Sequence, residues 1–170
     1  MADQMKVRSP RKPLAVRAVQ RDDVPGLKAI IDATGLFPSE MLDGMLTGYL
    51  DGSEAEAIWL ASKDGEQSCG IAYCAPEQMT SGTWNLYLIA FHPERQEQGH
   101  GTDLLAHLEG QLAARGERVL LVETSGLPEF ARTREFYARR GFNEEARIRD
   151  FYQAGEDKIV FRKDLSHRLN

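Results

Sequence analysis

A turn that contains Gly99 and Gly101 joins an apolar stretch, residues 84–91, to a leucine-rich stretch that begins at Leu104. The first stretch predicts a strand and the second predicts a helix. A helix that begins after such a turn leaves backbone N–H groups unpaired at its positive end. We therefore expect an anion site at this turn, and the alternative is a tight turn that binds no ligand.

Glu123 is a second candidate, because it ends the apolar run of residues 119–122. A carboxylate at the end of a buried strand could accept a proton from a substrate or hold that substrate in place. The alternative is a solvated charge at the strand end, and both interpretations fit the pattern.

The glycine turn also carries a family resemblance. Residues 96–101 read Gln-Glu-Gln-Gly-His-Gly, which resembles the Gln/Arg-x-x-Gly-x-Gly/Ala signature of the GNAT superfamily of acyl-CoA-dependent N-acetyltransferases. Residues 119–142 resemble a second segment of that family. The resemblance extends over residues 15–164. It implies a single-domain α/β (α+β mixed) fold, with a mostly antiparallel mixed sheet, helices on both faces and a splayed parallel strand pair at the cofactor site.

The resemblance implies acetyl-CoA as cosubstrate. No metal is expected, because no other His or Cys is spaced to join His100. In the family, amides of the glycine turn hold the pyrophosphate, and the strand before the turn pairs with the pantetheine arm. Arg134 lies one helical turn before Tyr137 and could reach an oxygen of CoA, although a solvated helix face is the alternative. The cofactor-binding residues implied in this way are Ile89, Ala90, Phe91, Glu97, Gln98, Gly99, His100, Gly101, Thr102 and Arg134.

Tyr137 matches the tyrosine of the family's second segment, which implies that its hydroxyl protonates the departing thiolate of CoA. The alternative is an aromatic side chain packed on the sheet. Some relatives carry a catalytic glutamate where this chain has Glu123, and others carry it on the preceding strand, where this chain has Asn85. Asn85 cannot accept a proton, so we expect it to contact the substrate together with Tyr87, which shares its strand face. Phe37 is expected to wall the acceptor site or to pack in the core.

Hydrophobic periodicity predicts the elements that position these residues. Asp64 and Gly65 predict a hairpin turn, and Gly35 and Gly141 predict helix ends. A strand that follows a crossover helix is expected to lie parallel to the strand before that helix. The predicted strands are residues 15–19, 57–62, 68–75, 84–91, 118–123, 142–152 and 158–163, and the predicted helices lie between residues 21 and 35, 38 and 50, 101 and 115, and 129 and 140.

The composition is that of one ordinary domain, with 170 residues, a formal net charge of -5 and a pI of about 5.4. Negative charge argues against a nucleic-acid partner, and the sequence has no apolar run of ~18 residues that would predict a membrane partner. The basic N-terminus lacks the apolar core of a signal peptide, so we expect a cytoplasmic protein with Cys69 and Cys74 as free thiols. Residues 1–13 are expected to form a flexible tail, and residues 14–170 the acetyltransferase domain.

These expectations combine into an N-acetyltransferase that moves an acetyl group from acetyl-CoA directly to a primary amine, without a covalent enzyme intermediate. A small-molecule amine is the expected acceptor, while a protein lysine or N-terminus stays open. The alternative from another class is an acyl-CoA-binding sensor or interaction module with the same fold and no catalysis. The sequence is compatible with a homodimer and does not specify the oligomeric state.

Overall fold

A sheet of seven strands runs through the part of the chain that the computed structural model describes, residues 11–166. The flexible tail expected over residues 1–13 therefore lies largely outside the described residues. The strands are β1 (Ala15–Ala18), β2 (Ile58–Asp64), β3 (Gln67–Pro76), β4 (Thr83–Phe91), β5 (Val119–Ser125), β6 (Asn143–Gln153) and β7 (Glu156–Asp164). The α-helices are α1 (Val24–Thr34), α2 (Met41–Asp51), α3 (His100–Ala114) and α4 (Ala131–Arg139), and short 3-10 turns lie at Arg21–Asp23, Pro93–Arg95 and Pro128–Phe130.

The strand order in the sheet is β1-β2-β3-β4-β5-β7-β6, and only β4 and β5 pair in parallel. The chain leaves β4, crosses through α3 and returns along β5, which produces the parallel pair. In the final hairpin it is β7 that lies beside β5, so β6 forms the edge of the sheet. The mixed, mostly antiparallel sheet predicted from the sequence is confirmed.

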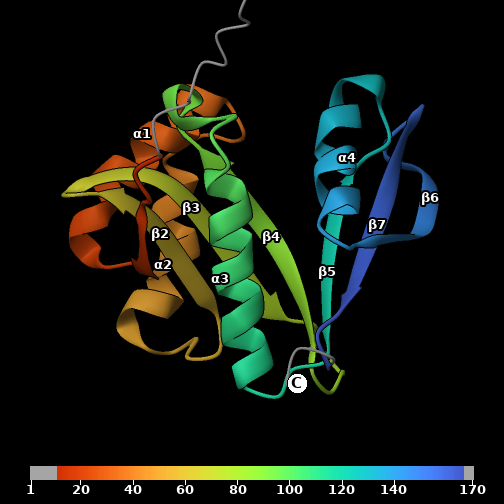
Figure 1. Cartoon of the computed structure of the whole chain (residues 1–170), viewed down its shortest axis with the longest axis horizontal. Coiled ribbons are helices and arrows are strands. Elements are labelled where there is room, and N and C mark those ends of the chain that lie inside the picture. Colours follow the sequence, from red (N-terminus) through yellow and green to blue (C-terminus); the bar gives the residue numbers. More distant parts are fainter. Residues whose placement is uncertain (1–10, 167–170) are drawn as a thin grey trace, which may run out of the picture.

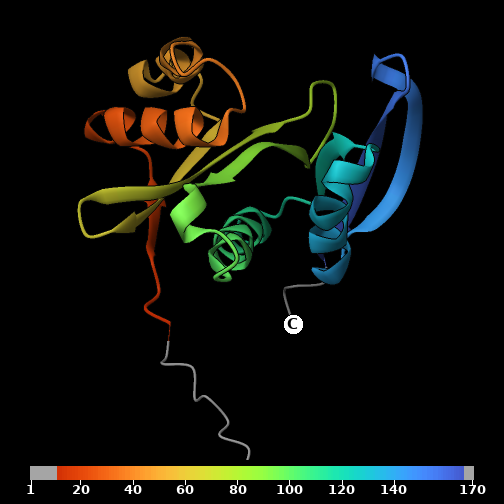
Figure 2. The same ribbon diagram turned by 90° about the horizontal axis from the view of Figure 1, so that it is seen from above.

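Helices cover both faces of the sheet. Figure 2 shows α1 and α2 on one face and α3 and α4 on the other. Each face buries its own apolar cluster, because helical residues three and four apart point toward the strands. On the first face the helices bury Leu27, Ile30, Ile31, Leu42 and Leu46. On the second face they bury Leu104, Leu105, Leu108, Leu112 and Tyr137.

The parallel pair opens along its length. β4 and β5 pair only from Thr83 with Val119 to Leu86 with Val122, although both strands continue beyond this point. Figure 1 shows them diverging towards the N-terminal end of α3. On its other side β4 skips one residue, Tyr87, in its pairing with β3, which is a bulge where the divergence begins. The splayed pair implied by the resemblance is therefore present.

Turns at the helix ends mostly follow the sequence. Gly35 ends α1 in the left-handed conformation, with φ of 64°, as predicted. The helix expected over residues 129–140 is shorter, because its first turn is a 3-10 turn. Pro128 opens that turn, and its carbonyl accepts a hydrogen bond from the amide of Ala131, three residues on. Within residues 11–166, no helix is long and apolar enough to cross a membrane.

Candidate active site

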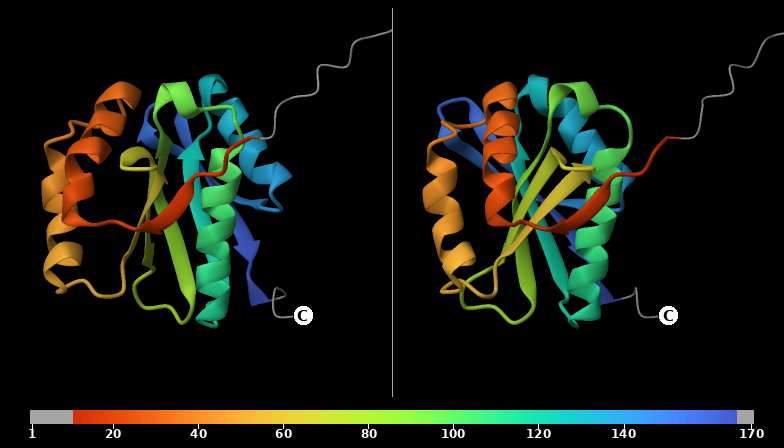
Figure 3. Two further views of the ribbon diagram at one scale, coloured as in Figure 1. Left: turned by 60° about the vertical axis from the view of Figure 1, so that its left-hand side comes forward. Right: turned by 90° about the vertical axis from the view of Figure 1, so that its left-hand side faces the viewer.

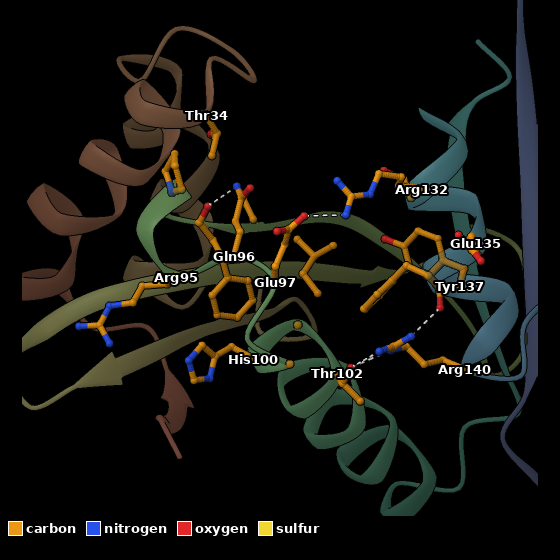
Figure 4. Close-up of a pocket in the computed structure, with 18 of the residues that line it drawn as sticks. Thr34, Arg95, Gln96, Glu97, His100, Thr102, Arg132, Glu135, Tyr137 and Arg140 are labelled. Carbon is orange, nitrogen blue, oxygen red and sulfur yellow. Dashed lines mark hydrogen bonds and ion pairs between the residues drawn. The ribbon is translucent and has the colours of Figure 1, made fainter. Parts of the chain in front are cut away.

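A pocket of about 990 Å³ lies between the turn before α3 and helix α4. Its walls come from the end of α1, the end of β4, the turn with the first residues of α3, and α4, and Figure 4 shows these parts facing one another. This volume suits a ligand of cofactor size. The expected site residues that line the pocket are Ile89, Ala90, Phe91, Glu97, Gly99, His100, Gly101, Thr102 and Tyr137.

The N-terminus of α3 points its amides into this pocket. Gly99 is the N-cap residue, with φ of 80°, and no side chain among residues 11–166 caps this end of the helix. The first N–H groups of a helix have no partner inside it, so those of α3 are available to a ligand. A Cβ on Gly101 would lie 3.5 Å from the Phe136 ring, an ordinary contact. Packing alone therefore does not require glycine at position 101, and its absent side chain leaves room beside the amides.

Arg11 contacts both the glycine turn and the first turn of α3, and it was not predicted from the sequence. One of its guanidinium nitrogens donates a hydrogen bond to the carbonyl of Gln98 at 2.6 Å, and the other pairs with Asp103 at 2.5 Å. Figure 3 shows the chain from residue 11 passing the N-terminal end of α3 on its way to β1. A Cβ on Gly99 would come within 2.7 Å of Arg11, so the guanidinium occupies the space that a side chain at Gly99 would need. This contact joins positions 87 residues apart, which no local pattern could indicate.

The pocket is locally positive although the chain is acidic. Four arginines line it, Arg95, Arg132, Arg139 and Arg140, against two glutamates, Glu97 and Glu135. An anion is therefore favoured in this pocket by charge as well as by the helix terminus.

Two contacts join the turn and α3 to α4 across the pocket. Arg132 pairs with Glu97 at 2.7 Å, and Figure 4 shows this pair spanning the pocket. Both side chains of the pair are exposed, at 87% and 70%. Arg140 stacks on the Phe136 ring at 3.9 Å and donates hydrogen bonds to Thr102 on α3.

Tyr137 lies on the α4 wall with only 3% of its surface exposed. Its ring packs against Phe136, Phe142 and Phe161, which fixes its orientation. Burial raises the pKa of the Tyr137 hydroxyl above its ordinary value, because a phenolate would be poorly solvated there. The group therefore stays protonated at neutral pH and can act as a proton donor.

The end of β4 offers a free backbone edge to the pocket. Ile89, Ala90 and Phe91 pair with β3 on one side, and on the other side the pairing with β5 has already ended. The carbonyl of Phe91 accepts a hydrogen bond from the Gln96 side chain at 3.0 Å. A ligand that adds to this edge would therefore pair with the backbone of Ile89 and Ala90.

On the opposite face of the sheet, the structure brings together three of the four residues expected near the acceptor, namely Glu123, Asn85 and Tyr87. The side-chain nitrogen of Asn85 donates to Glu123 at 3.4 Å and to Glu77 at 2.8 Å. The hydroxyl of Tyr87 donates to the same oxygen of Glu77 at 3.1 Å. Burial, followed by the bond to Glu77, raises the pKa of Tyr87 to about 12. Lys158 on β7 pairs with the second oxygen of Glu123 at 3.2 Å.

Glu77 was not predicted from the sequence, because it follows Pro76 in the connection between two predicted strands and matches no motif. Its backbone N–H bonds to the carbonyl of Thr83 at 2.8 Å, so the hairpin between β3 and β4 fixes its position. The only sequence signal was its nearness to the predicted ends of these two strands.

The remaining predicted site residues lie outside the pocket lining or serve the structure around it. Arg134 donates hydrogen bonds to the carbonyls of Ser125 and Leu127, at 2.8 and 2.9 Å, and thereby holds the turn between β5 and α4. Phe37 packs against the cluster beneath α1 and α2. The Gln98 side chain donates to the carbonyl of Glu94 at 2.9 Å.

His100 opens α3 and is 4% exposed. Its ring stacks on Phe91 at 6.2 Å, and burial lowers its pKa. Its Nε2 lies 3.3 Å from the side-chain oxygen of Gln98. Among the described residues, no three His, Cys, Asp or Glu side chains gather as a metal site.

Comparison with known proteins identifies a family. Residues 54–144 match the family model "Acetyltransferase (GNAT) domain". A solved protein from Desulfovibrio desulfuricans that is assigned to the GNAT family of acetyltransferases is 34% identical, with a TM-score of 0.81, and the match covers 90% of this chain and 99% of that chain. No match was found among curated proteins.

Two further solved structures share the fold at lower identity. The ribosomal-protein-S18-alanine N-acetyltransferase from Escherichia coli is 22% identical, with a TM-score of 0.72, over 90% of this chain and 94% of that chain. An aminoglycoside 6'-N-acetyltransferase complexed with coenzyme A is 17% identical, with a TM-score of 0.73, over 92% of this chain and 99% of that chain. The acceptors in these two names differ, so a shared fold does not determine the acceptor.

Proposed function

This chain belongs to the GNAT acetyltransferase family, and from that premise we propose that it transfers the acetyl group of acetyl-CoA directly to a primary amine of a small molecule. The observation that carries the proposal is a single pocket that joins an uncapped helix N-terminus to a buried, protonated tyrosine. The first feature suits the phosphates of CoA, and the second suits its sulfur end.

The residues present fit acetyl-CoA. The amides at the start of α3 and the four arginines around them suit the pyrophosphate and the 3'-phosphate. The free edge of β4 at Ile89 and Ala90 suits the amide groups of the pantetheine arm. When bound, acetyl-CoA supplies an activated thioester, and the chain's own residues orient it and move protons.

The transfer needs a neutral amine and a proton for the thiolate that departs. An alkyl amine with a pKa of ~10.4 must lose its proton before it can attack. On the opposite face of the sheet, Glu123 is the carboxylate expected from the sequence to take this proton. It lies at the Asn85 amide, and Glu77 is a second carboxylate at the same amide and beside Tyr87. On the cofactor side, Tyr137 donates a proton to the sulfur as the carbon–sulfur bond breaks.

Direct transfer is also supported by the state of the cysteines. Cys69 and Cys74 are both buried in β3, away from the lining of the pocket. Burial raises the pKa of the Cys74 thiol, which keeps it protonated and a poor nucleophile. Neither thiol is suited to carry the acetyl group between the two substrates.

The proposal is tested by following free thiol release from acetyl-CoA against a panel of polyamines, aminoglycosides, amino acids and peptides with free N-termini. We expect thiol release with at least one small amine, and an acetylated product by mass spectrometry. Thiol release with peptides alone would show that the acceptor is a peptide amine and not a small molecule. No release with any amine, although acetyl-CoA raises the melting temperature, would contradict transfer and favour a sensor.

A further inference from the structure

Two carboxylates from different strands meet at one buried amide on the acceptor side of the sheet. The Asn85 nitrogen donates to Glu77 at 2.8 Å and to Glu123 at 3.4 Å. Asn85 is 1% exposed, whereas both glutamates are half-buried. The amide therefore holds the two carboxylates close together while each keeps a path to solvent or to a ligand.

The other atom of the same amide has no partner. The oxygen of Asn85 is fully buried and accepts no hydrogen bond within residues 11–166. A buried acceptor without a donor is unfavourable, so such atoms in native proteins usually call for a missing ligand or water. An ammonium group carries three donors and one positive charge, which suits an amide oxygen beside two carboxylates.

The two carboxylates differ in how their charge is balanced. Glu123 pairs with Lys158 at 3.2 Å, and Lys158 also lies over the Phe151 ring at 3.8 Å. Glu77 has two hydrogen-bond donors, Asn85 and Tyr87, and both are uncharged. In the described part of the chain, no cation forms an ion pair with Glu77, so its charge is available to a cationic substrate.

The cluster of Glu77, Asn85 and Glu123 also lies where the two substrates would meet. Asn85 is next to Leu86, the last residue of β4 that pairs with β5, and Glu123 follows Val122, its partner on β5. Beyond these residues the strands diverge (Figure 1). Trp84 and Leu86 enter the core beneath α3, so Asn85 between them faces away from the pocket that Tyr137 lines. A thioester held on one face could reach an amine on the other through this opening.

We propose that Glu77, together with the Asn85 oxygen, binds the ammonium group of the acceptor and that Glu77 takes its first proton. The inference rests on the proposed acetyltransferase function and adds a residue and a substrate class to it. The acceptor class is a primary alkyl amine without a carboxylate beside the nitrogen. Such a carboxylate would be brought against Glu77 and Glu123, of which only Glu123 has a cationic partner.

The proposed step balances as follows. The ammonium group gives one proton to the Glu77 carboxylate and becomes a neutral amine. The amine nitrogen forms a bond to the acetyl carbon while the bond from that carbon to sulfur breaks. The thiolate takes a proton from Tyr137, and the second proton lost by the nitrogen restores Tyr137. Glu77 then releases its proton to solvent, and the products are the amide and free CoA.

The test compares Glu77→Gln with wild type on the best amine of the panel. Glutamine keeps an oxygen that can accept from Asn85 and Tyr87, so we expect an unchanged melting temperature. At pH 7 we expect kcat/KM to fall about 100-fold, the usual scale for loss of a proton acceptor. Near pH 10 the difference should shrink below about tenfold, because the amine (pKa ~10.4) then loses its proton to solvent. Glu123→Gln tests the competing carboxylate, and its loss of kcat/KM at pH 7 should be smaller than that of Glu77→Gln.

The outcomes separate this inference from the function on which it rests. A wild-type protein that acetylates no amine contradicts the proposed function and this inference with it. The role of Glu77 alone is overturned if the wild type is active and Glu77→Gln has an unchanged kcat/KM. The same holds if the loss of kcat/KM in Glu77→Gln does not shrink at high pH. If Glu123→Gln loses more than Glu77→Gln, the proton acceptor is Glu123. If the best acceptor is a free α-amino acid, the proposed substrate class is wrong.

Discussion

The two faces of the sheet at the β4–β5 divergence offer opposite chemistry to their ligands. On the α3–α4 face, which we call the donor face, the proposed binding groups are backbone amides at a glycine turn, beside four arginines that line the same pocket. On the other face, which we call the acceptor face, the proposed binding groups are side chains, namely two glutamates that accept hydrogen bonds from one buried asparagine. The first arrangement suits an anionic donor and the second suits a cationic acceptor. A sheet that opens between them can therefore separate two substrates of opposite charge and still let them react.

We expect the largest loss of activity from Tyr137→Phe, which removes the proposed proton donor of the donor face. We expect kcat to fall by about 10²- to 10⁴-fold, because the sulfur loses its proton donor. The ring contacts with Phe142 and Phe161 remain, so the melting temperature should hold. Tyr49→Phe on α2 is the control, because the Tyr49 hydroxyl bonds the carbonyl of Val19 and does not line the pocket, and it should keep activity within about twofold. An unchanged kcat at saturating substrates would exclude Tyr137 as the acid.

The pH profile adds a second check on Tyr137. Its pKa is raised, so the phenol stays protonated through the ordinary tyrosine range and loses its proton only at higher pH. We therefore expect no decline of kcat below pH ~10 from this group. A decline of kcat between pH 7 and 9 that is absent in Tyr137→Phe would contradict the buried position of the Tyr137 hydroxyl.

Gly99→Ala should weaken the donor face next most strongly. The substitution places a Cβ against Arg11 and strains a left-handed residue, so we expect acetyl-CoA to bind at least about tenfold more weakly. Gly52→Ala is a matched control, because Gly52 has φ of 84° and a Cβ added there would meet no other atom within 4 Å. Both variants should lose about 1–2 kcal/mol of stability, and only Gly99→Ala should lose affinity. Equal affinities for acetyl-CoA would show that the turn does not hold the donor.

Substitutions in the pair formed by Glu97 and Arg132 should give the smallest effect. They test whether the donor face favours an anion by charge. Both side chains are largely exposed, so the pair stabilises the structure by less than about 1 kcal/mol. We expect Glu97→Gln to tighten acetyl-CoA binding and Arg132→Gln to weaken it, each by less than about fivefold. Both changes should diminish in ~1 M salt, where charges are screened within ~3 Å. Changes of the same sign in the two variants would contradict a phosphate site beside this pair.

The glycine turn and the helix of the donor face could be predicted from the sequence, because they depend on neighbouring residues. Gly99 and Gly101 lie within one turn, and the leucines from Leu104 onward set the direction of the helix that follows. The hairpin at Asp64 and Gly65 was predictable for the same reason, since its conformation depends on neighbouring residues.

The acceptor face could be predicted only in part. Glu123, Asn85 and Tyr87 were predicted as site residues from their strand positions. Glu77 reaches them only because β3 and β4 pair up to the hairpin where β3 ends and β4 begins. The bulge at Tyr87 and the end of pairing at Leu86 depend on three strands at once. Arg11 and Lys158 were missed for the same physical reason, because their partners are distant in sequence.

The division between the two faces is tested most directly by measuring the dissociation constant of acetyl-CoA by calorimetry for wild type, Gly99→Ala and Glu77→Gln. If the donor binds only on the α3–α4 face, Gly99→Ala should weaken binding at least about tenfold, and Glu77→Gln should stay within about twofold of wild type. Equal weakening in the two variants, or an unchanged constant in Gly99→Ala, would contradict the division.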